Sequence, residues 1–111
     1  MNIKLTNSAL MALSEMVDAM GISKEMTKIE GKTNEEVGKE LIGLFFTKLY
    51  KAKKQYYNFI IEFKEINIED KNLTEEEIYN KKIEIAANMD VIELFKELFQ
   101  IEGISDFLSL T

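Results

Sequence analysis

The chain has no proline in 111 residues, and this absence constrains its fold more than any other feature. Proline breaks or kinks helices because its ring removes a backbone hydrogen bond and clashes with the preceding turn. Long helices can therefore run without a forced kink. No six-residue segment alternates apolar and polar side chains as a half-buried strand would. We predict an all-α protein in which residues 1–111 form a single helical domain.

The first predicted helix follows Asn7, a residue that commonly caps helix N-termini. Gly21 can adopt a left-handed backbone conformation and ends this helix. A shorter segment at residues 23–30 predicts about two further turns, which are stable only if they pack. The apolar side chains of the first helix recur at helical spacing: Leu10, Leu13, Met16, Val17 and Met20.

The longest predicted element begins at a capping box, in which Thr33 accepts from the amide of Glu36 and the Glu36 side chain reaches back. No strong stop follows before residues 67–72. The sequence therefore predicts a small bundle around one long central helix, about residues 34–66, with shorter N- and C-terminal helices. Gly43 and the lysines of residues 51–54 mark two places where this helix could break.

The long helix carries apolar side chains on two sides when its residues are spaced by about 100°. One arc is suited to face the core: Val37, Leu41, Phe45, Leu49, Ala52, Tyr56, Phe59 and Phe63. A second stripe lies roughly 90° or more away from that arc. This second stripe either packs inside the bundle or forms a protein-binding or self-association surface, and its members are Phe46, Tyr50, Tyr57 and Ile61.

A polar connection at residues 66–73 precedes a second capping box, formed by Thr74 and Glu77, which opens a helix to about Met89. Asp90 is suited to cap the next helix, and Gly103 lies just beyond its end. The predicted apolar face of that helix consists of Ile92, Phe95, Leu98 and Phe99.

Ser105 could cap a last turn that carries Phe107, Leu108 and Leu110. A chain end this apolar either docks on the core, which we favour, or contacts a partner. Phe95, Phe99 and Phe107 therefore remain candidates for protein binding.

Cysteine, histidine, tryptophan and arginine are absent as well. The chain thus lacks a thiol nucleophile, the usual general base near neutral pH, and the commonest transition-metal ligands. The pairs Glu36/Glu40 and Glu62/Glu65 are typical of solvated helix faces, and the acidic segment 67–77 lacks the glycine of an EF-hand. We predict no enzyme activity, no catalytic residue, no cofactor and no metal site.

The formal charge is −6, from 14 lysines and 20 acidic residues. Lys48, Lys51, Lys53 and Lys54 lie beside tyrosines, a combination that can bind nucleic acid. On a continuous helix, however, these lysines form a cuff around the axis, and the negative net charge opposes polyanion binding. We expect no nucleic-acid partner. No stretch of about 18 uncharged apolar residues and no signal-peptide pattern is present, so we expect an intracellular protein without a membrane partner.

The order of these segments is similar to that of a known family. Residues 32–42 lead into residues 48–52, the aromatic segment 57–60 follows, and residues 88–99 run into Gly103 and Phe107. Over about residues 5–110 this order resembles the small tail assembly chaperones of long-tailed phages that infect low-GC Gram-positive bacteria. The resemblance implies a mostly helical, non-enzymatic protein of the host cell cytoplasm that is absent from the mature virion. It also implies binding to the tape measure protein, which is kept soluble, and help in recruiting tail tube protein subunits.

A coat for a long amphipathic helical client needs an apolar, adaptable surface and enough charge to remain soluble. We therefore hypothesise that the second stripe and the C-terminal aromatic residues contact the client or another copy of the chain in a homo-oligomer. These candidates are Phe46, Tyr50, Tyr57, Ile61, Phe95, Phe99 and Phe107.

Two alternatives stay open at this point. One is a small acidic phage-encoded inhibitor of a host defence protein that acts by protein–protein binding and needs a concentrated negative face. The other is a small helical enzyme that uses glutamate and lysine, which needs a pocket with a strongly perturbed pKa.

Overall fold

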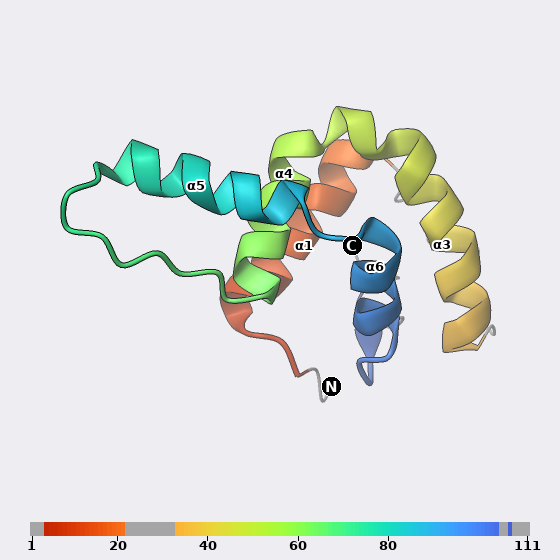
Figure 1. The fold of residues 1–111 in the computed structure, drawn as a ribbon. Coiled ribbons are helices and arrows are strands. Elements are labelled where there is room, and N and C mark those ends of the chain that lie inside the picture. The colour runs from red at the N-terminus through yellow and green to blue at the C-terminus, as the bar shows by residue number, and fades with distance from the viewer. Residues whose placement is uncertain (1–3, 22–32, 105–106, 108–111) are drawn as a thin grey trace.

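The computed structural model describes residues 4–21, 33–104 and 107. In this part of the chain there are five α-helices, one short 3-10 helix and no strand, which confirms the all-α prediction there. The elements are α1 (Asn7–Met20), α3 (Asn34–Lys48), η2 (Leu49–Lys51), α4 (Lys53–Phe63), α5 (Glu75–Ala87) and α6 (Val91–Phe99) (Figure 1).

Several predictions fall outside the described part of the chain. They concern the segment 23–30, the turn after Ser105, and the side chains of Leu108 and Leu110. Within α3, the side chains of Val37, Leu41 and Phe45 are also not described.

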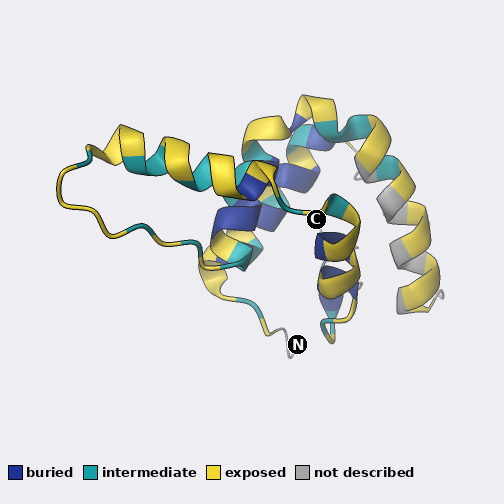
Figure 2. Ribbon diagram, in the orientation of Figure 1, coloured by how far each residue is buried: buried dark blue, intermediate teal, exposed yellow. Residues whose placement is uncertain are grey.

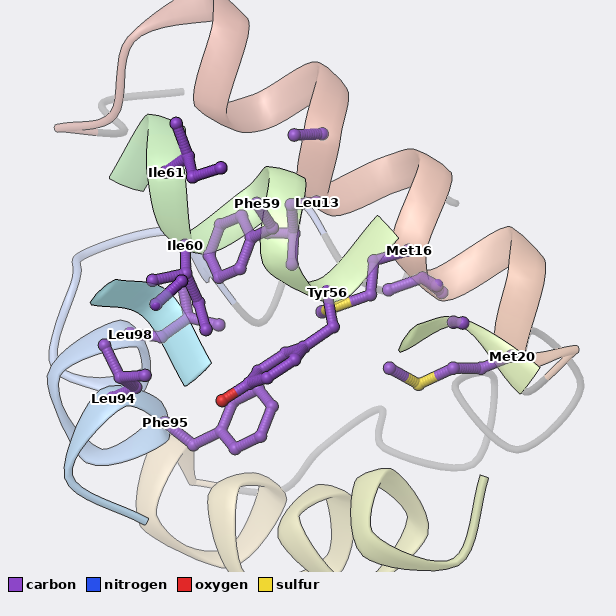
Figure 3. Packing of buried hydrophobic residues seen from close by; sticks show 14 of the residues in the cluster. Leu13, Met16, Met20, Tyr56, Phe59, Ile60, Ile61, Leu94, Phe95 and Leu98 are labelled. Carbon is purple, nitrogen blue, oxygen red and sulfur yellow. The ribbon is translucent and has the colours of Figure 1, made fainter. Parts of the chain in front are cut away.

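The core lies where α4 meets α1 and α6. Helix α4 packs along α1, contacts α5 on another side, and continues from η2, which also touches α1. Figure 3 shows Phe59 and Ile60 of α4 among Leu13 of α1 and Leu98 of α6. Helix α3 contacts α6, so the chain wraps around this cluster (Figure 1). Burial of these apolar side chains is the main force that holds the helices together.

Helix α1 follows its predicted pattern closely. Gly21 has φ +70° and donates to the carbonyl of Asp18, so it ends the helix as predicted. The N-cap is Thr6, one residue before the predicted cap Asn7, and its hydroxyl accepts from the Ala9 amide at 3.1 Å. Four predicted face residues are fully buried and Leu10 is half-buried; the buried ones are Leu13, Met16, Val17 and Met20.

The predicted long central helix is wrong, because the chain breaks between α3 and α4. It forms the 3-10 turn η2 and then leaves helical geometry at Ala52, with φ −129° and ψ 29°. The Ala52 amide donates to Leu49 three residues back, which tightens the backbone. Ala52 itself is fully buried in the core cluster. The break therefore lies near one of the two predicted places, residues 51–54, and not at Gly43.

Helix α4 ends at Phe63, a few residues before the expected boundary. The Glu65 amide donates to Glu62 and the Ile66 amide to Ile61, which is the Schellman pattern. Glu65 holds φ +50° in this motif, a conformation usually given to glycine. No glycine or proline marks this end of α4, so the sequence did not predict it.

Helices α3, α5 and α6 start at the predicted caps. The Glu36 amide donates to the Thr33 hydroxyl, which in turn donates to the Glu36 carboxylate. Thr74 and Glu77 form the full capping box, with both hydrogen bonds at 3.1 Å. The Glu93 amide donates to Asp90 at the start of α6. These starts depend on local chemistry, so the sequence is sufficient to predict them.

Helix α6 buries a face that is rotated from the predicted one. Leu94 is buried although it was not predicted, whereas Ile92 is 44% exposed. Phe95, Leu98 and Phe99 are buried as expected. At about 100° per residue, Ile92 and Leu94 lie on nearly opposite sides of the helix. Ile92 therefore lies at the edge of the buried apolar face.

Candidate protein-interaction surface

The break separates the members of the predicted second stripe. Phe46 is 52% exposed and Tyr50 is 75% exposed, whereas Ile61 is only 9% exposed. Tyr57 is half-buried and packs against the core cluster. The prediction of one continuous stripe is therefore wrong, because α4 turns Ile61 into the core while the end of α3 and η2 keep their aromatic side chains outside.

The C-terminal aromatic residues dock on the core, as favoured above. Phe95 and Phe99 are 1% and 7% exposed, and Phe107 is half-buried against the same cluster. The Phe95 ring lies 6.4 Å from the Tyr56 ring, measured between centroids. Ile61, Phe95 and Phe99 thus fill the interior in this structure, and their proposed role in partner binding is corrected accordingly.

The exposed aromatic residues lie on a corner of the chain where α3 passes through η2 into α4 (Figure 1). The Thr47 hydroxyl donates to the carbonyls of Gly43 and Leu44, a bond that often accompanies helix bending. The buried side of the corner is Ala52, and its outer side is exposed (Figure 2). We call this outer side the basic corner, which comprises Phe46, Lys48, Tyr50, Lys51, Lys53 and Lys54.

The basic corner has a charge opposite to that of the rest of the molecule. Residues 41–61 contain four lysines and no acidic residue, whereas the remaining chain has ten lysines and twenty acidic residues. Lys51, Lys53 and Lys54 are exposed and Lys48 is half-buried. The Lys51 ammonium lies 6.0 Å from the centre of the Tyr50 ring. The corner thus combines two exposed aromatic rings with a formal charge of +4.

The predicted cuff of lysines required a continuous helix. In the structure these lysines belong to the end of α3, to η2 and to the start of α4. Nine residues, Phe46 to Lys54, span at most about 15 Å along such elements, so the lysines and the aromatic rings share one small region. The sequence places the lysines beside tyrosines, and the absence of acidic residues over residues 41–61 was a further signal that they form one positively charged region.

Other parts of the described structure offer less for binding or catalysis. A shallow pocket of about 170 Å³ lies between the start of α1 and the end of α4, and charged side chains such as Lys4, Glu62 and Glu65 line it. No group of three or more acidic residues is placed to hold a metal ion among the described residues. Met11 of α1 is a further exposed apolar side chain, at 65% exposure.

Tyr56 is the one described side chain whose buried polar atom has no hydrogen-bond partner there. Burial, with smaller contributions from Tyr57 and Asp90, raises the pKa of the Tyr56 hydroxyl to about 12. The hydroxyl is therefore protonated at neutral pH and points into an apolar interior beside Phe95 (Figure 3). Such a group suits neither a general base nor a nucleophile near pH 7.

No helix in the described part is long and apolar enough to span a membrane. Comparisons with protein-family models, with curated proteins and with solved structures gave no match. The geometry of the basic corner therefore carries the functional proposal.

Proposed function

We propose that the protein is a non-enzymatic phage tail assembly chaperone of the host cytoplasm that binds the tape measure protein and keeps it soluble. In this proposal it also helps to recruit tail tube subunits and is not retained in the mature virion. The observation that carries the proposal is the basic corner, where Phe46 and Tyr50 are exposed on an otherwise acidic helical protein. Exposed aromatic residues of this size commonly anchor protein interfaces.

The basic corner fits an amphipathic helix better than a small-molecule substrate. Two aromatic rings four residues apart can hold the apolar side of such a helix, while neighbouring lysine stems cover its flank and keep their charges in water. The negative charge of the remaining surface favours a soluble complex. Among the earlier binding candidates, Phe46 and Tyr50 form the proposed contact, with Tyr57 and Phe107 at half-buried positions.

Co-expression with a tape measure fragment tests the proposal. The fragment should stay soluble and co-elute with the chain in size-exclusion chromatography with light scattering. Substitution of Phe46→Ser with Tyr50→Ser should abolish co-elution and leave the helical circular dichroism unchanged, because both side chains are exposed. The matched control is Ile85→Ser with Ile92→Ser, which removes exposed apolar side chains elsewhere. Insolubility of the fragment with the unmodified chain would reject the chaperone function.

The alternative function, an acidic inhibitor of a host defence protein, is favoured by one observation. Exposed carboxylates gather at the start of α5 and in the connection before it: Glu69, Asp70, Glu75, Glu76 and Glu77. An inhibitor of this kind would depend on these residues and not on Phe46 or Tyr50. Pull-down of host proteins with the unmodified chain and with a Glu75→Lys, Glu76→Lys variant separates the two functions, since only the inhibitor would lose its target in that variant.

A further inference from the structure

The acidic residues at the start of α5 form a second pole of the molecule. We call this region, residues 69–77, the acidic tip; it contains five carboxylates and one lysine, a formal charge of −4. All six charged side chains are exposed. Leu73 and Ile78 occupy the positions of a hydrophobic staple around the Thr74 cap. Both are half-buried, and neither belongs to the core cluster. The tip therefore offers apolar side chains next to concentrated negative charge.

The acidic tip and the basic corner of one molecule lie apart. Figure 1 shows α5 extending away from the body, with its start and the preceding connection far from the corner between α3 and α4. The molecule is elongated, with principal extents of 51 × 29 × 21 Å. At physiological salt, charges interact strongly only within about 8 Å. The opposite charges of the two regions therefore cannot neutralise each other within one copy.

We propose that the acidic tip of one copy docks on the basic corner of a second copy. The two regions carry formal charges of opposite sign and equal size, −4 and +4, and each places exposed or half-buried apolar side chains beside its charges. Carboxylates of the tip pair with Lys51, Lys53 and Lys54, while Phe46 and Tyr50 pack on Leu73 and Ile78. Electrostatic complementarity of this kind fixes the orientation of partners and excludes like-charged pairings.

The contact joins two different regions, so it is head-to-tail. Each added copy presents one free corner and one free tip, and the assembly grows as an open chain or closes into a ring. Pairing of two corners is opposed by repulsion among eight lysines, and pairing of two tips by repulsion among carboxylates. This self-association does not depend on the proposed client, although a client on the same corner would compete with it.

Sedimentation velocity over a range of protein concentrations tests the proposal. The unmodified chain should associate at about 50 mM salt and dissociate at about 0.5 M salt, because screening weakens exposed charge pairs. A constant monomer mass at low salt and high concentration would overturn the proposal. Association that persists unchanged at high salt would overturn the assigned interface.

Charge reversal identifies the two surfaces. K51E with K54E should weaken association about tenfold or more, and E75K with E76K should do the same from the other side. An equimolar mixture of the two variants should recover association, because each then presents a surface complementary to the other. The control K39E with K96E makes the same change in net charge as K51E with K54E, at exposed positions on α3 and α6 outside both regions, and should leave association within about threefold.

Loss of association in the control variant alone, or an acidic-tip variant that associates normally, would contradict the head-to-tail pairing. All reversed side chains are exposed, so unchanged circular dichroism is expected. If a variant fails to fold, the proposal is still tested by whether the unmodified chain associates at low salt and dissociates at high salt.

Discussion

The basic corner and the rest of helix α4, residues 55–63, are adjacent segments rich in aromatic residues, but they lie in opposite environments. Phe46 and Tyr50 are 52% and 75% exposed, whereas Phe59 and Tyr56 are 2% and 5% exposed. Both segments carry aromatic residues at helical spacing. The difference shows that periodicity identifies which residues share a side of a helix, but not which side meets the core once the helix is interrupted.

The cause of the difference is the position of the break. Three residues of 3-10 helix and the non-helical Ala52 change the direction of the chain before α4 begins. Ala52 is small enough to be fully buried at this point, where η2 packs near α1. Helix α4 then faces α1 and α6 with its aromatic side, while the corner remains on the surface.

The largest expected effect compares the same residue type in the two segments. Phe59→Ala should lower the free energy of unfolding by about 3–5 kcal/mol, because it opens a cavity among α1, α4 and α6. Phe46→Ala should change it by about 0.5 kcal/mol or less, since the side chain is mostly in water. Urea unfolding followed by circular dichroism measures both. Similar losses for the two variants would show that Phe46 is a core residue and would remove the contrast.

A second pair compares the hydroxyl of Tyr56, which belongs to α4, with the hydroxyl of Tyr79, which reaches α4 from α5. Tyr56→Phe removes a buried hydroxyl without a partner in the described structure and should stabilise the protein by about 1 kcal/mol. Tyr79→Phe is the matched control, because the Tyr79 hydroxyl donates to Asn58 at 2.5 Å. Its loss should destabilise the protein by about 1 kcal/mol. Equal and destabilising effects would mean that the Tyr56 hydroxyl has a partner.

The same hydroxyl predicts a dependence on alkaline pH. The pKa of Tyr56 is raised from 10.0 to about 12 in the folded state, so the folded chain holds this proton more tightly than the unfolded chain. The associated stability is present below pH 10 and is lost as the pH rises toward 12. Ultraviolet titration of the folded protein should show a tyrosine that ionises only at high pH, and this component should be missing in Tyr56→Phe. The absence of such a component before the protein unfolds would contradict the burial of the Tyr56 hydroxyl.

A third pair compares a glycine inside α3 with the glycine that ends α1. A Cβ added at Gly43 or at Gly21 would meet no atom within 4 Å beyond the local backbone, so space does not separate them. Gly43 lies within α3, and Gly43→Ala should stabilise the protein by about 0.5–1 kcal/mol through helix propensity. Gly21 has φ +70°, and Gly21→Ala should destabilise it by about 1 kcal/mol. Thermal unfolding of both variants measures the two changes in stability. Changes of the same sign would contradict the prediction.

The smallest effect concerns the exposed cap of α5. The backbone amide of Thr74, and then its side chain, hold the pKa of Glu77 below its usual value, with a smaller contribution from Lys81. Because the folded-state pKa is lowered, this contribution to stability is present above the usual pKa and is lost as the pH falls through the lowered value. Carboxyl chemical shifts should show Glu77 titrating at low pH in the folded chain, and Thr74→Val should move its pKa upward. Titration at the usual value would mean that the capping box is open in solution.

Local chemistry made much of the fold predictable. The caps at Thr33, Thr74 and Asp90 and the left-handed stop at Gly21 each depend on a few neighbouring residues, and all are found where predicted. The end of α4 was not predictable in this way, because Glu65 adopts a left-handed conformation without the glycine that usually signals it. The break at Ala52 lies at one of the two predicted places. The neighbouring residues alone did not determine that the chain breaks there and does not continue as one helix.

The sequence by itself determined that this chain is helical, where most helices begin, and which aromatic residues and lysines are neighbours along it. It achieved this because hydrogen-bond caps, the absence of proline and the 3.6-residue period act over one or two turns. Only the tertiary structure decided that Ile61, Phe95 and Phe99 lie inside while Phe46 and Tyr50 stay outside. That choice depends on the direction in which α4 leaves the corner, and the direction is set by packing between residues distant in sequence.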